Sequence, residues 1–281
     1  MPYLLGFIIA LFIALTGVGA GTITVPLLML FLGVPAPIAV GIGLTFSAVV
    51  KLLLAPAQIA RRNVSWHTLA HMLLGGVPGI LIGALALNRF VAAGSGRMLN
   101  ALLGVVLIAT ASWQIFFSLR PEHKQAERKD RRFLLALLML PVGAEVGFSS
   151  AGAGALGSAA LLALTPLSAA QVVGTDIVFG ALLSLLGALA QGLPNGFHFS
   201  LDQPLLLPML AGGLLGAISG LLLAGRVPRR PMRFALWLWI LVLGGQLVIH
   251  SYNTRNLHIR KEQTNLALSS THRGHRWSTG F

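Results

Sequence analysis

Long apolar stretches separated by short polar ones make up most of this 281-residue chain. An α-helix needs about 20 apolar residues to cross the hydrocarbon core of a membrane. Dividing the apolar sequence by that span predicts about eight hydrophobic segments rather than one globular core. We therefore expect an all-α, polytopic integral membrane protein. Four of the stretches are close to the length of one crossing: Pro35–Ala60, Leu69–Leu87, Met98–Leu119 and Met232–Ile249.

Two other apolar stretches, Pro2–Leu32 and Phe133–Leu164, do not fit a simple crossing. Each has about 31 residues, too many for one untilted crossing and too few for two. Glycines interrupt each stretch near its middle. Irregular backbone at membrane depth is tolerated only where it faces protein or a watery cavity. We therefore expect a broken or re-entrant helix in both places.

The two interrupted stretches occupy matching places in an internal repeat. Sliding the second half back by about 133 positions aligns residues 19–84 without a gap, with about 20 identities in about 66 positions. Interrupted segments at matching places of two repeats are the best sequence indication of a transport site. The identities include Gly19-Ala20-Gly21 with Gly152-Ala153-Gly154, Val40-Gly41 with Val173-Gly174, Gln58 with Gln191, and Gly79 and Gly83 with Gly212 and Gly216.

Glycines also recur at every fourth residue in two of the simple spans. Small residues at this spacing lie on one face of a helix and let a neighbouring helix approach closely. We therefore expect one helix-packing face in each half of the chain. These faces are formed by Gly75, Gly79 and Gly83 and by Gly212, Gly216 and Gly220.

A charged segment divides the chain near its middle, and a basic, polar segment ends it. We predict a first transmembrane repeat over residues 1–119, a charged linker over 120–132, a second repeat over 133–251 and a tail over 252–281. The tail mixes basic residues with Ser, Thr, Asn and His and cannot build a core, which predicts disorder. The first apolar stretch lacks the Lys or Arg that opens a secretory signal, so we expect it to be retained.

The formal net charge is +13, although only 10% of the residues are charged. Lys and Arg gather in the gaps between apolar stretches and in the tail, which is typical of membrane proteins and not of nucleic-acid binding. We therefore expect a multi-pass protein of the inner or plasma membrane, in contact with lipid. Because the chain has no cysteine, disulfides and thiolate chemistry are excluded. We expect no metal, no cofactor and no enzymatic activity, and a homo-oligomer is left open.

The basic loops indicate how the interrupted elements lie in the membrane. If each element crosses once, loop Lys and Arg divide about eight against six between the two sides. If both elements return to the side they entered, the division is about twelve against two, and the halves become inverted repeats. The basic tail then lies on the less basic side, which weakens the comparison. We favour inversion, with Arg61, Arg62, the linker and the 226–233 loop on the cytoplasmic side.

The interruptions themselves carry the candidate chemistry. A half-helix that begins at such a break directs unpaired N–H groups and the positive end of its dipole into the site, which suits an anion. Flanking hydroxyl groups add donors. Close packing explains the glycines equally well, but two such stretches in register favour a binding site for a small anion. The candidate residues are Thr16, Gly17, Gly19, Gly21, Thr22, Ser149, Ser150, Gly152 and Gly154.

Three ionisable residues lie within the apolar stretches: Lys51, Glu145 and Asp176. Such residues face a polar cavity or a partner, because their burial in lipid is costly. Lys51 either attracts the anion or pairs with one of the two carboxylates. Glu145 and Asp176 are candidates for taking up a proton as a coupling ion. Gln58 and Gln191 share one repeat position, where a neutral amide either binds the anion or joins two helices.

Three motifs are similar to those of a known family: Gly17–Leu28 in the first interruption, the basic loop Arg61–Trp66, and Val173-Gly174-Thr175. On these residues the chain resembles the TauE/SafE sulfite exporters, also called toluene sulfonate uptake permeases, over about residues 5–250. The resemblance implies export or uptake of sulfite, sulfonates or related sulfur-containing anions. The second break departs from the family pattern, with Ser149-Ser150-Ala151 where more glycine is expected.

Two other functions compete with alternating-access transport of an anion. Backbone groups and small residues also build filters, so a passive anion channel is the nearer alternative, although an inverted repeat favours alternating access. The segment from Gly147 to Ser150 superficially resembles the nucleophile turn of an intramembrane serine hydrolase, with His198 or His250 as the base. The glycine that should follow the serine is missing, and both histidines lie at predicted span ends.

Overall fold

The computed structural model describes residues 2–16, 20–94, 96–119, 131–151, 154, 156–195, 204–223, 234 and 237–249, and the regular structure of these residues is helical throughout. The all-α prediction is thus confirmed for them. In chain order the helices are α1 (Pro2–Thr16), α2 (Ala20–Phe31), α3 (Ala36–Ala60), α4 (Trp66–Ala92), α5 (Gly96–Leu119), α6 (Arg132–Ser149), α7 (Leu156–Leu164), α8 (Ala169–Asn195) and α10 (Leu206–Leu223), followed by an apolar helix over Trp237–Ile249.

Six of the described helices are long and apolar enough to cross a membrane, namely α3, α4, α6, α8, α10 and most of α5. The first two helices and the one over Trp237–Ile249 are apolar but shorter. Leucines on the outer faces are more than 60% exposed, for example Leu74, Leu85, Leu207 and Leu222. Such a surface would drive aggregation in water, whereas in a membrane it contacts lipid. The predicted polytopic architecture is therefore confirmed.

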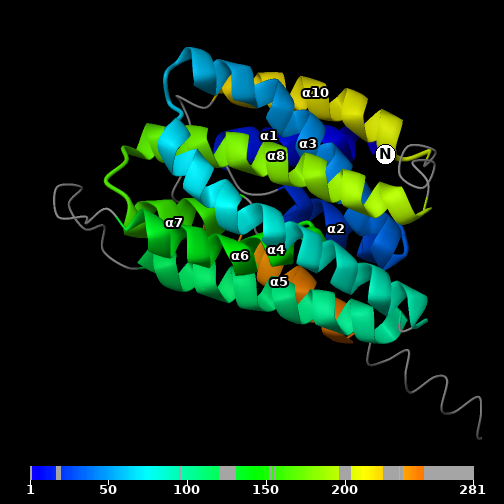
Figure 1. The fold of residues 1–281 in the computed structure, drawn as a ribbon. Coiled ribbons are helices and arrows are strands. Elements are labelled where there is room, and N and C mark those ends of the chain that lie inside the picture. The colour runs from blue at the N-terminus through cyan, green and yellow to red at the C-terminus, as the bar shows by residue number, and fades with distance from the viewer. Residues whose placement is uncertain are drawn as a thin grey trace, which may run out of the picture.

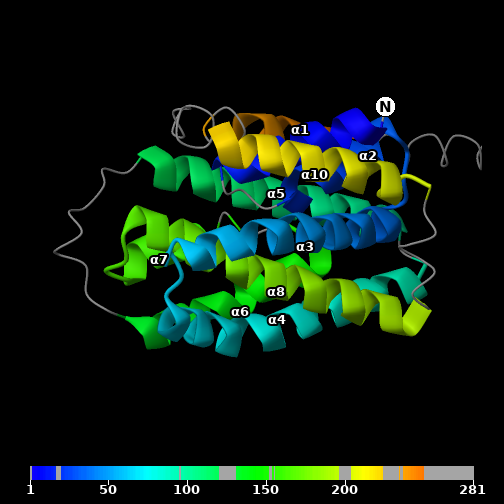
Figure 2. The same ribbon diagram turned by 90° about the horizontal axis from the view of Figure 1, so that it is seen from above.

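Helices α3 and α8 cross in opposite directions at the centre of the bundle. Ser184 Oγ donates a hydrogen bond to Ser47 Oγ (3.0 Å), and Lys51 packs against Gly180. Residue numbers rise along α3 and fall along α8 through these contacts, so the two helices are antiparallel. Figure 1 shows that the long helices share one axis, and Figure 2 shows the central pair between α1 and α10 on one side and α4 and α6 on the other.

The predicted glycine faces join the two halves. Each glycine meets a helix from the opposite half so closely that a Cβ atom would overlap it, with backbone atoms at five of them and the Ala14 Cβ at Gly220. On α4, Gly75, Gly79 and Gly83 meet Ala136, Leu140 and Ala144 of α6, and on α10, Gly212, Gly216 and Gly220 meet Tyr3, Phe7 and Leu11 of α1. The packing role that the spacing predicted is confirmed, and in each pair the helices run parallel.

These contacts are reciprocal between the halves. The residues that meet the glycines, such as Tyr3 and Ala136, lie 133 positions apart, as in the sequence alignment. The glycines themselves, such as Gly75 and Gly212, lie 137 positions apart. The expected gapless pairing of Gly79 with Gly212 therefore does not hold in three dimensions. The two offsets differ by four, so the second half has four more residues than the first between the residues that meet glycines and its own glycine face.

The directions of two central helices agree with the expected inversion. Helices α3 and α8 occupy matching repeat positions and run in opposite directions (Figure 2). Gly33, with a left-handed φ of 63°, leads from α2 into α3, and Val25 packs against Gly43 across that hairpin. The opposite directions of α3 and α8 favour halves related by inversion over eight simple crossings.

Basic residues gather at one end of the bundle. Arg132 Nη1 lies 2.5 Å from His67 Nδ1, which brings the starts of α4 and α6 to the same end. Arg61 and Arg62 immediately precede α4, so they lie on the side from which α6 begins. This agrees with the predicted basic side. Residues 120–130, the 226–233 loop and the tail lie outside the described residues, so their sides stay a prediction.

We expect Gly83→Ala to destabilise the fold, because the added Cβ atom would meet the Ala144 carbonyl oxygen. Overpacking costs about 1–3 kcal/mol, which corresponds to a melting temperature lower by about 5 °C in detergent. Gly245→Ala is the matched control. It lies in a helix, and no atom of the other described helices lies within 4 Å of the added Cβ; alanine favours a helix by about 1 kcal/mol. Equal melting temperatures for the two variants would contradict the packing role.

Candidate functional site

The first break separates α1 from α2, where the sequence predicted an interruption. Thr16 is the last residue of α1, and its side chain lies outside what the structure describes. Gly17 and Gly19 also lie outside the described residues. Gly21 and Thr22 belong to the first turn of α2, and Thr22 is fully buried.

The second break separates α6 from α7. Ser149 ends α6, and Ser150 takes a left-handed backbone conformation with φ of 60°. The Ser150 N–H donates to the Val146 carbonyl (2.8 Å), which closes the last turn of the helix. Gly154 lies in a buried turn, and Gly152 lies outside the described residues. A serine, rather than one of the glycines, therefore makes the turn out of α6.

The two breaks lie against each other. Gly21 faces the backbone carbonyl of Ser150 so closely that a Cβ atom on residue 21 would overlap it. A Cβ atom on Gly43 of α3 would lie 3.0 Å from Ser150 Oγ and 3.0 Å from Val25 Cγ2. Residue 21 must be glycine, because a side chain there would push the two breaks apart. Residue 43 has little room for a side chain larger than that of glycine. The start of α2, the middle of α3 and the end of α6 converge here.

The hydroxyl of Ser150 is a side-chain hydrogen-bond donor at the place where the two breaks meet. The residue is 4% exposed, and its Oγ has no hydrogen-bond partner among the residues that the structure describes. A buried hydroxyl without a partner costs about 1–3 kcal/mol and calls for an explanation. Its position between two glycines makes it a candidate binding group for a ligand.

Ser149 has the environment of a helix-capping residue. Its Oγ donates to the Glu145 carbonyl (2.9 Å) and accepts from the N–H of Ala151 (3.2 Å). These bonds hold the end of α6, and they occupy the hydroxyl that a serine hydrolase would use. His198 and His250, the bases considered for such an enzyme, lie outside the described residues.

The start of α2 adds donors beside Ser150. The first four N–H groups of a helix have no acceptor within that helix. In α2 they belong to residues 20–23, next to the contact between Gly21 and Ser150. The partial positive charge at a helix N-terminus favours anions. The N–H groups and the serine hydroxyl together form a candidate anion site whose donors carry no formal charge.

A second polar cluster joins α3, α7 and α8. Lys51 and Asp176 are each 2% exposed, and their opposite charges attract each other. Ser158 Oγ donates to Asp176 Oδ2 (2.8 Å). Gly157 and Gly180 leave room for the pair, because a Cβ atom on the first would meet Asp176 Oδ1 and one on the second would meet Lys51 Nζ. Of the two carboxylates considered for Lys51, the structure pairs it with Asp176.

The basic loop and the Val-Gly-Thr motif are far apart in the sequence but touch in the structure. The Ser65 N–H donates to Thr175 Oγ1 (3.0 Å), and Gly174 packs against Asn63. Gln58, in the last turns of α3, bonds to this loop, because Asn63 Nδ2 donates to Gln58 Oε1 (3.1 Å). The loop thereby positions the part of α8 that carries the buried carboxylate. The predicted contact of Gln58 with an anion stays a prediction.

Gln191, at the same repeat position, has a different partner. Its Nε2 donates to the carbonyl of Gly147 (3.1 Å) in the last turn of α6. The last carbonyls of a helix lack a donor within that helix. Gln191 therefore satisfies one of them and holds α8 against the second break. Gln191 thus contacts the end of α6 directly, whereas Gln58 bonds to Asn63 in the basic loop.

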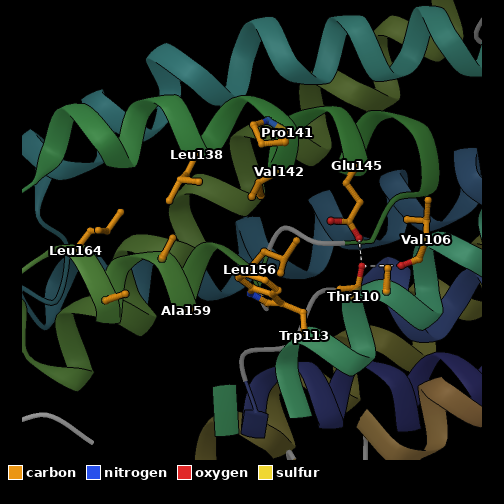
Figure 3. A pocket seen from close by; sticks show the side chains of 13 residues that line it. Val106, Thr110, Trp113, Leu138, Pro141, Val142, Glu145, Leu156, Ala159 and Leu164 are labelled. Carbon is orange, nitrogen blue, oxygen red and sulfur yellow. Dashed lines mark hydrogen bonds between the residues drawn. The ribbon is translucent and has the colours of Figure 1, made fainter. Parts of the chain in front are cut away.

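Glu145 lies in a cavity of about 520 Å³ between α5, α6 and α7. Figure 3 shows its carboxyl group facing Thr110 of α5, whose Oγ1 donates to Glu145 Oε1. The other lining side chains are apolar or aromatic, and they include Trp113, Leu138, Val142, Leu156 and Ala159. Among the lining residues, Glu145 alone is ionisable. It has no part in the cluster of Lys51 and Asp176.

Sequence reasoning missed three residues of these sites. Gly43, Ser158 and Thr110 look like ordinary small or hydroxyl residues within apolar spans. Gly43 did carry a signal, because it lies 133 positions before Asp176 and marks a difference between otherwise similar halves. Ser158 and Thr110 carried none, since their partners are on other helices.

Replacing either member of the pair of Lys51 and Asp176 should destabilise the protein. Lys51→Met leaves a buried carboxylate without its counter-charge, Asp176→Asn leaves a buried ammonium, and each change costs about 3 kcal/mol or more. The double variant should lose less than the sum of the two, by about 0.5–3 kcal/mol. Thermal unfolding of the purified variants measures these losses. Additive losses would show that the two side chains do not interact.

Comparison with known proteins agrees with the motifs. The sequence profile of the family described as Sulfite exporter TauE/SafE matches residues 3–247. A relative from Bacillus subtilis (strain 168), named Probable membrane transporter protein YjnA, is 30% identical over 213 residues, which cover 73% of this chain and 82% of the relative. No solved structure matches the chain. The matched range includes both breaks and both polar clusters.

Proposed function

Since the chain belongs to the Sulfite exporter TauE/SafE family, we propose that it transports a small sulfur-containing oxyanion, such as sulfite or a sulfonate. Its matched relative is named as a membrane transporter, and six described helices are suited to crossing a membrane. The substrate class rests on the family description and on the donors at the breaks. We place the protein in the inner or plasma membrane, with no enzymatic step.

The contact between Gly21 and Ser150 is the observation that carries this proposal. An oxyanion that crosses a membrane loses its water and needs donors held at depth, and the N-termini of half-helices supply them. The N–H groups of α2 and the Ser150 hydroxyl, which has no hydrogen-bond partner within the described ranges, are such donors. Because they are uncharged, they bind an anion without trapping it beside a fixed counter-charge. The anion enters when the two breaks move apart, and the glycines allow the breaks to pack closely again.

The arrangement of the halves supports alternating access. Inverted repeats move by rocking one unit against the other around a fixed site. Here α3 and α8 cross antiparallel at the centre, and each broken element packs on a helix of the opposite half. Movement between the halves therefore acts directly on the contact between the two breaks.

We assign proton coupling to Glu145 rather than to Asp176. Asp176 has Lys51 as a counter-charge and Ser158 as a donor, so a proton there would leave a buried cation unbalanced. Glu145 faces a cavity without a basic residue among its lining side chains. It also lies one turn before the second break, where Ser149 bonds to its carbonyl. A change at Glu145 is thus transmitted to the end of α6.

Ser150→Ala should weaken anion transport without weakening the fold. A hydrogen bond to a charged group contributes about 1.5–3 kcal/mol, so the KM for sulfite should rise roughly ten-fold or more. The melting temperature should stay the same or rise, because the removed hydroxyl is buried and has no partner in the part of the chain that the structure describes. Uptake of radiolabelled sulfite into proteoliposomes measures the first effect, and thermal unfolding measures the second.

The matched control is Ser219→Ala, which removes a serine hydroxyl that bonds to the Leu215 carbonyl on an exposed face. It should leave the KM unchanged. An unchanged KM in Ser150→Ala would remove the proposed site. Flux that does not saturate with sulfite, in the wild type, would indicate a passive channel in place of a carrier.

Glu145→Gln should uncouple the anion from the pH gradient. Glutamine keeps the shape of the side chain and still accepts from Thr110, but it cannot exchange a proton. Uptake driven by a pH gradient should fall to the level seen without a gradient. Exchange of sulfite across the membrane at equal pH should persist, since it needs no net proton movement. Full gradient-driven uptake by this variant would rule Glu145 out as the coupling residue.

A further inference from the structure

The two breaks have matching surroundings with different chemistry. At the offset of 133 positions, Gly43 corresponds to Asp176 and Val25 corresponds to Ser158. The contacts correspond as well, because Val25 packs against Gly43 and Ser158 donates to Asp176 (2.8 Å). Beside α2 a glycine thus takes the place that a carboxylate takes beside α7.

The Asp176 carboxylate lies at the start of α7. Its Oδ2 accepts from Ser158, and its Oδ1 lies against Gly157, both in the first turn of this nine-residue helix. The dipole of α7 favours negative charge at its N-terminus, whether the charge belongs to a side-chain carboxylate or to a free anion. Lys51, reaching from α3, supplies the counter-charge. The start of α7 therefore already holds an anion, which is tethered to α8.

The start of α2 has different neighbours. Gly43 contributes no side chain, and the hydroxyl beside it is Ser150 from the other half. Lys51 has its repeat equivalent in Ser184, which donates to the buried hydroxyl of Ser47 (3.0 Å). The side chains that the structure brings together here are uncharged, so no carboxylate of theirs cancels the positive end of α2.

We propose that the start of α7 is a second anion site whose permanent ligand is the carboxylate of Asp176. The protein then has two related anion positions and offers only the one at α2 to a substrate. The claim that the α2 position binds a substrate rests on the proposed function. The claim that Asp176 occupies an anion position at α7 rests on the contacts of Asp176 alone. Lys51 balances the tethered anion, so it does not belong to the substrate site.

Deleting the tethered anion should let a free one bind in its place. Asp176→Gly introduces the residue found at the corresponding position of α3 and leaves Lys51 buried without its carboxylate. The variant should melt roughly 10 °C below the wild type. Formate is small enough for the space of the deleted side chain. It should raise the melting temperature of the variant in a saturable way and recover at least about half of the loss.

Two matched variants control this experiment. Asp176→Asn fills the same space with a neutral amide and should not respond to formate. Lys51→Met combined with Asp176→Gly removes the counter-charge and should abolish the response. Chloride at equal ionic strength controls for salt. Where the glycine variant is too unstable to purify, Asp176→Ala replaces it, with the same response expected.

A formate response of equal size in Asp176→Gly, Asp176→Asn and the wild type would overturn the second site. The absence of any response in both the glycine and the alanine variants would overturn it as well. Sulfite uptake by Ser150→Ala reports on the α2 site separately. An unchanged KM in that variant would refute the proposed function and leave the formate result unaffected, so the two outcomes can be told apart.

Discussion

The structure depends on satisfying the backbone at two helix breaks that lie within an apolar medium. Each unpaired N–H or C=O group in lipid costs several kcal/mol, by order of magnitude, so a break can exist only inside protein. The chain places its two breaks against each other, with Gly21 against Ser150. It also adds side-chain bonds at the helix end, such as the one from Gln191 to Gly147. The Ser150 hydroxyl, which has no hydrogen-bond partner among the described residues, is suited to an anion.

The glycine faces hold the breaks in that position. Helices α1 and α6 each lead into a break, and each packs along a glycine face of the opposite half. Close backbone approach lets van der Waals contacts and weak Cα–H···O bonds stabilise helix pairs in lipid, where the hydrophobic effect between helices is absent. The halves are therefore interleaved, and neither can move without acting on the contact between the breaks.

Charge is distributed so that the proposed substrate position stays neutral. Lys51 and Asp176 compensate each other beside α7, and Glu145 lies with Thr110 in a separate apolar cavity. A carrier must bind its anion well enough to admit it and weakly enough to release it. Neutral donors at the start of α2 meet both demands, whereas a buried lysine there would hold the anion more strongly.

The sequence by itself determined the all-α membrane fold, the places of both interruptions, the glycine packing faces and the three buried ionisable residues. These features depend on hydrophobic length and on spacing within one helix, which are local properties of the chain. Only the tertiary structure decided that Lys51 pairs with Asp176, that Ser150 and not Ser149 has a free hydroxyl among the described residues, and that Gly43 lies between the breaks. Such partners lie on different helices. Because the two halves are similar in sequence, each side chain has two possible partners that the sequence does not distinguish. The choice between them follows from helix direction and crossing, which the sequence pattern does not contain.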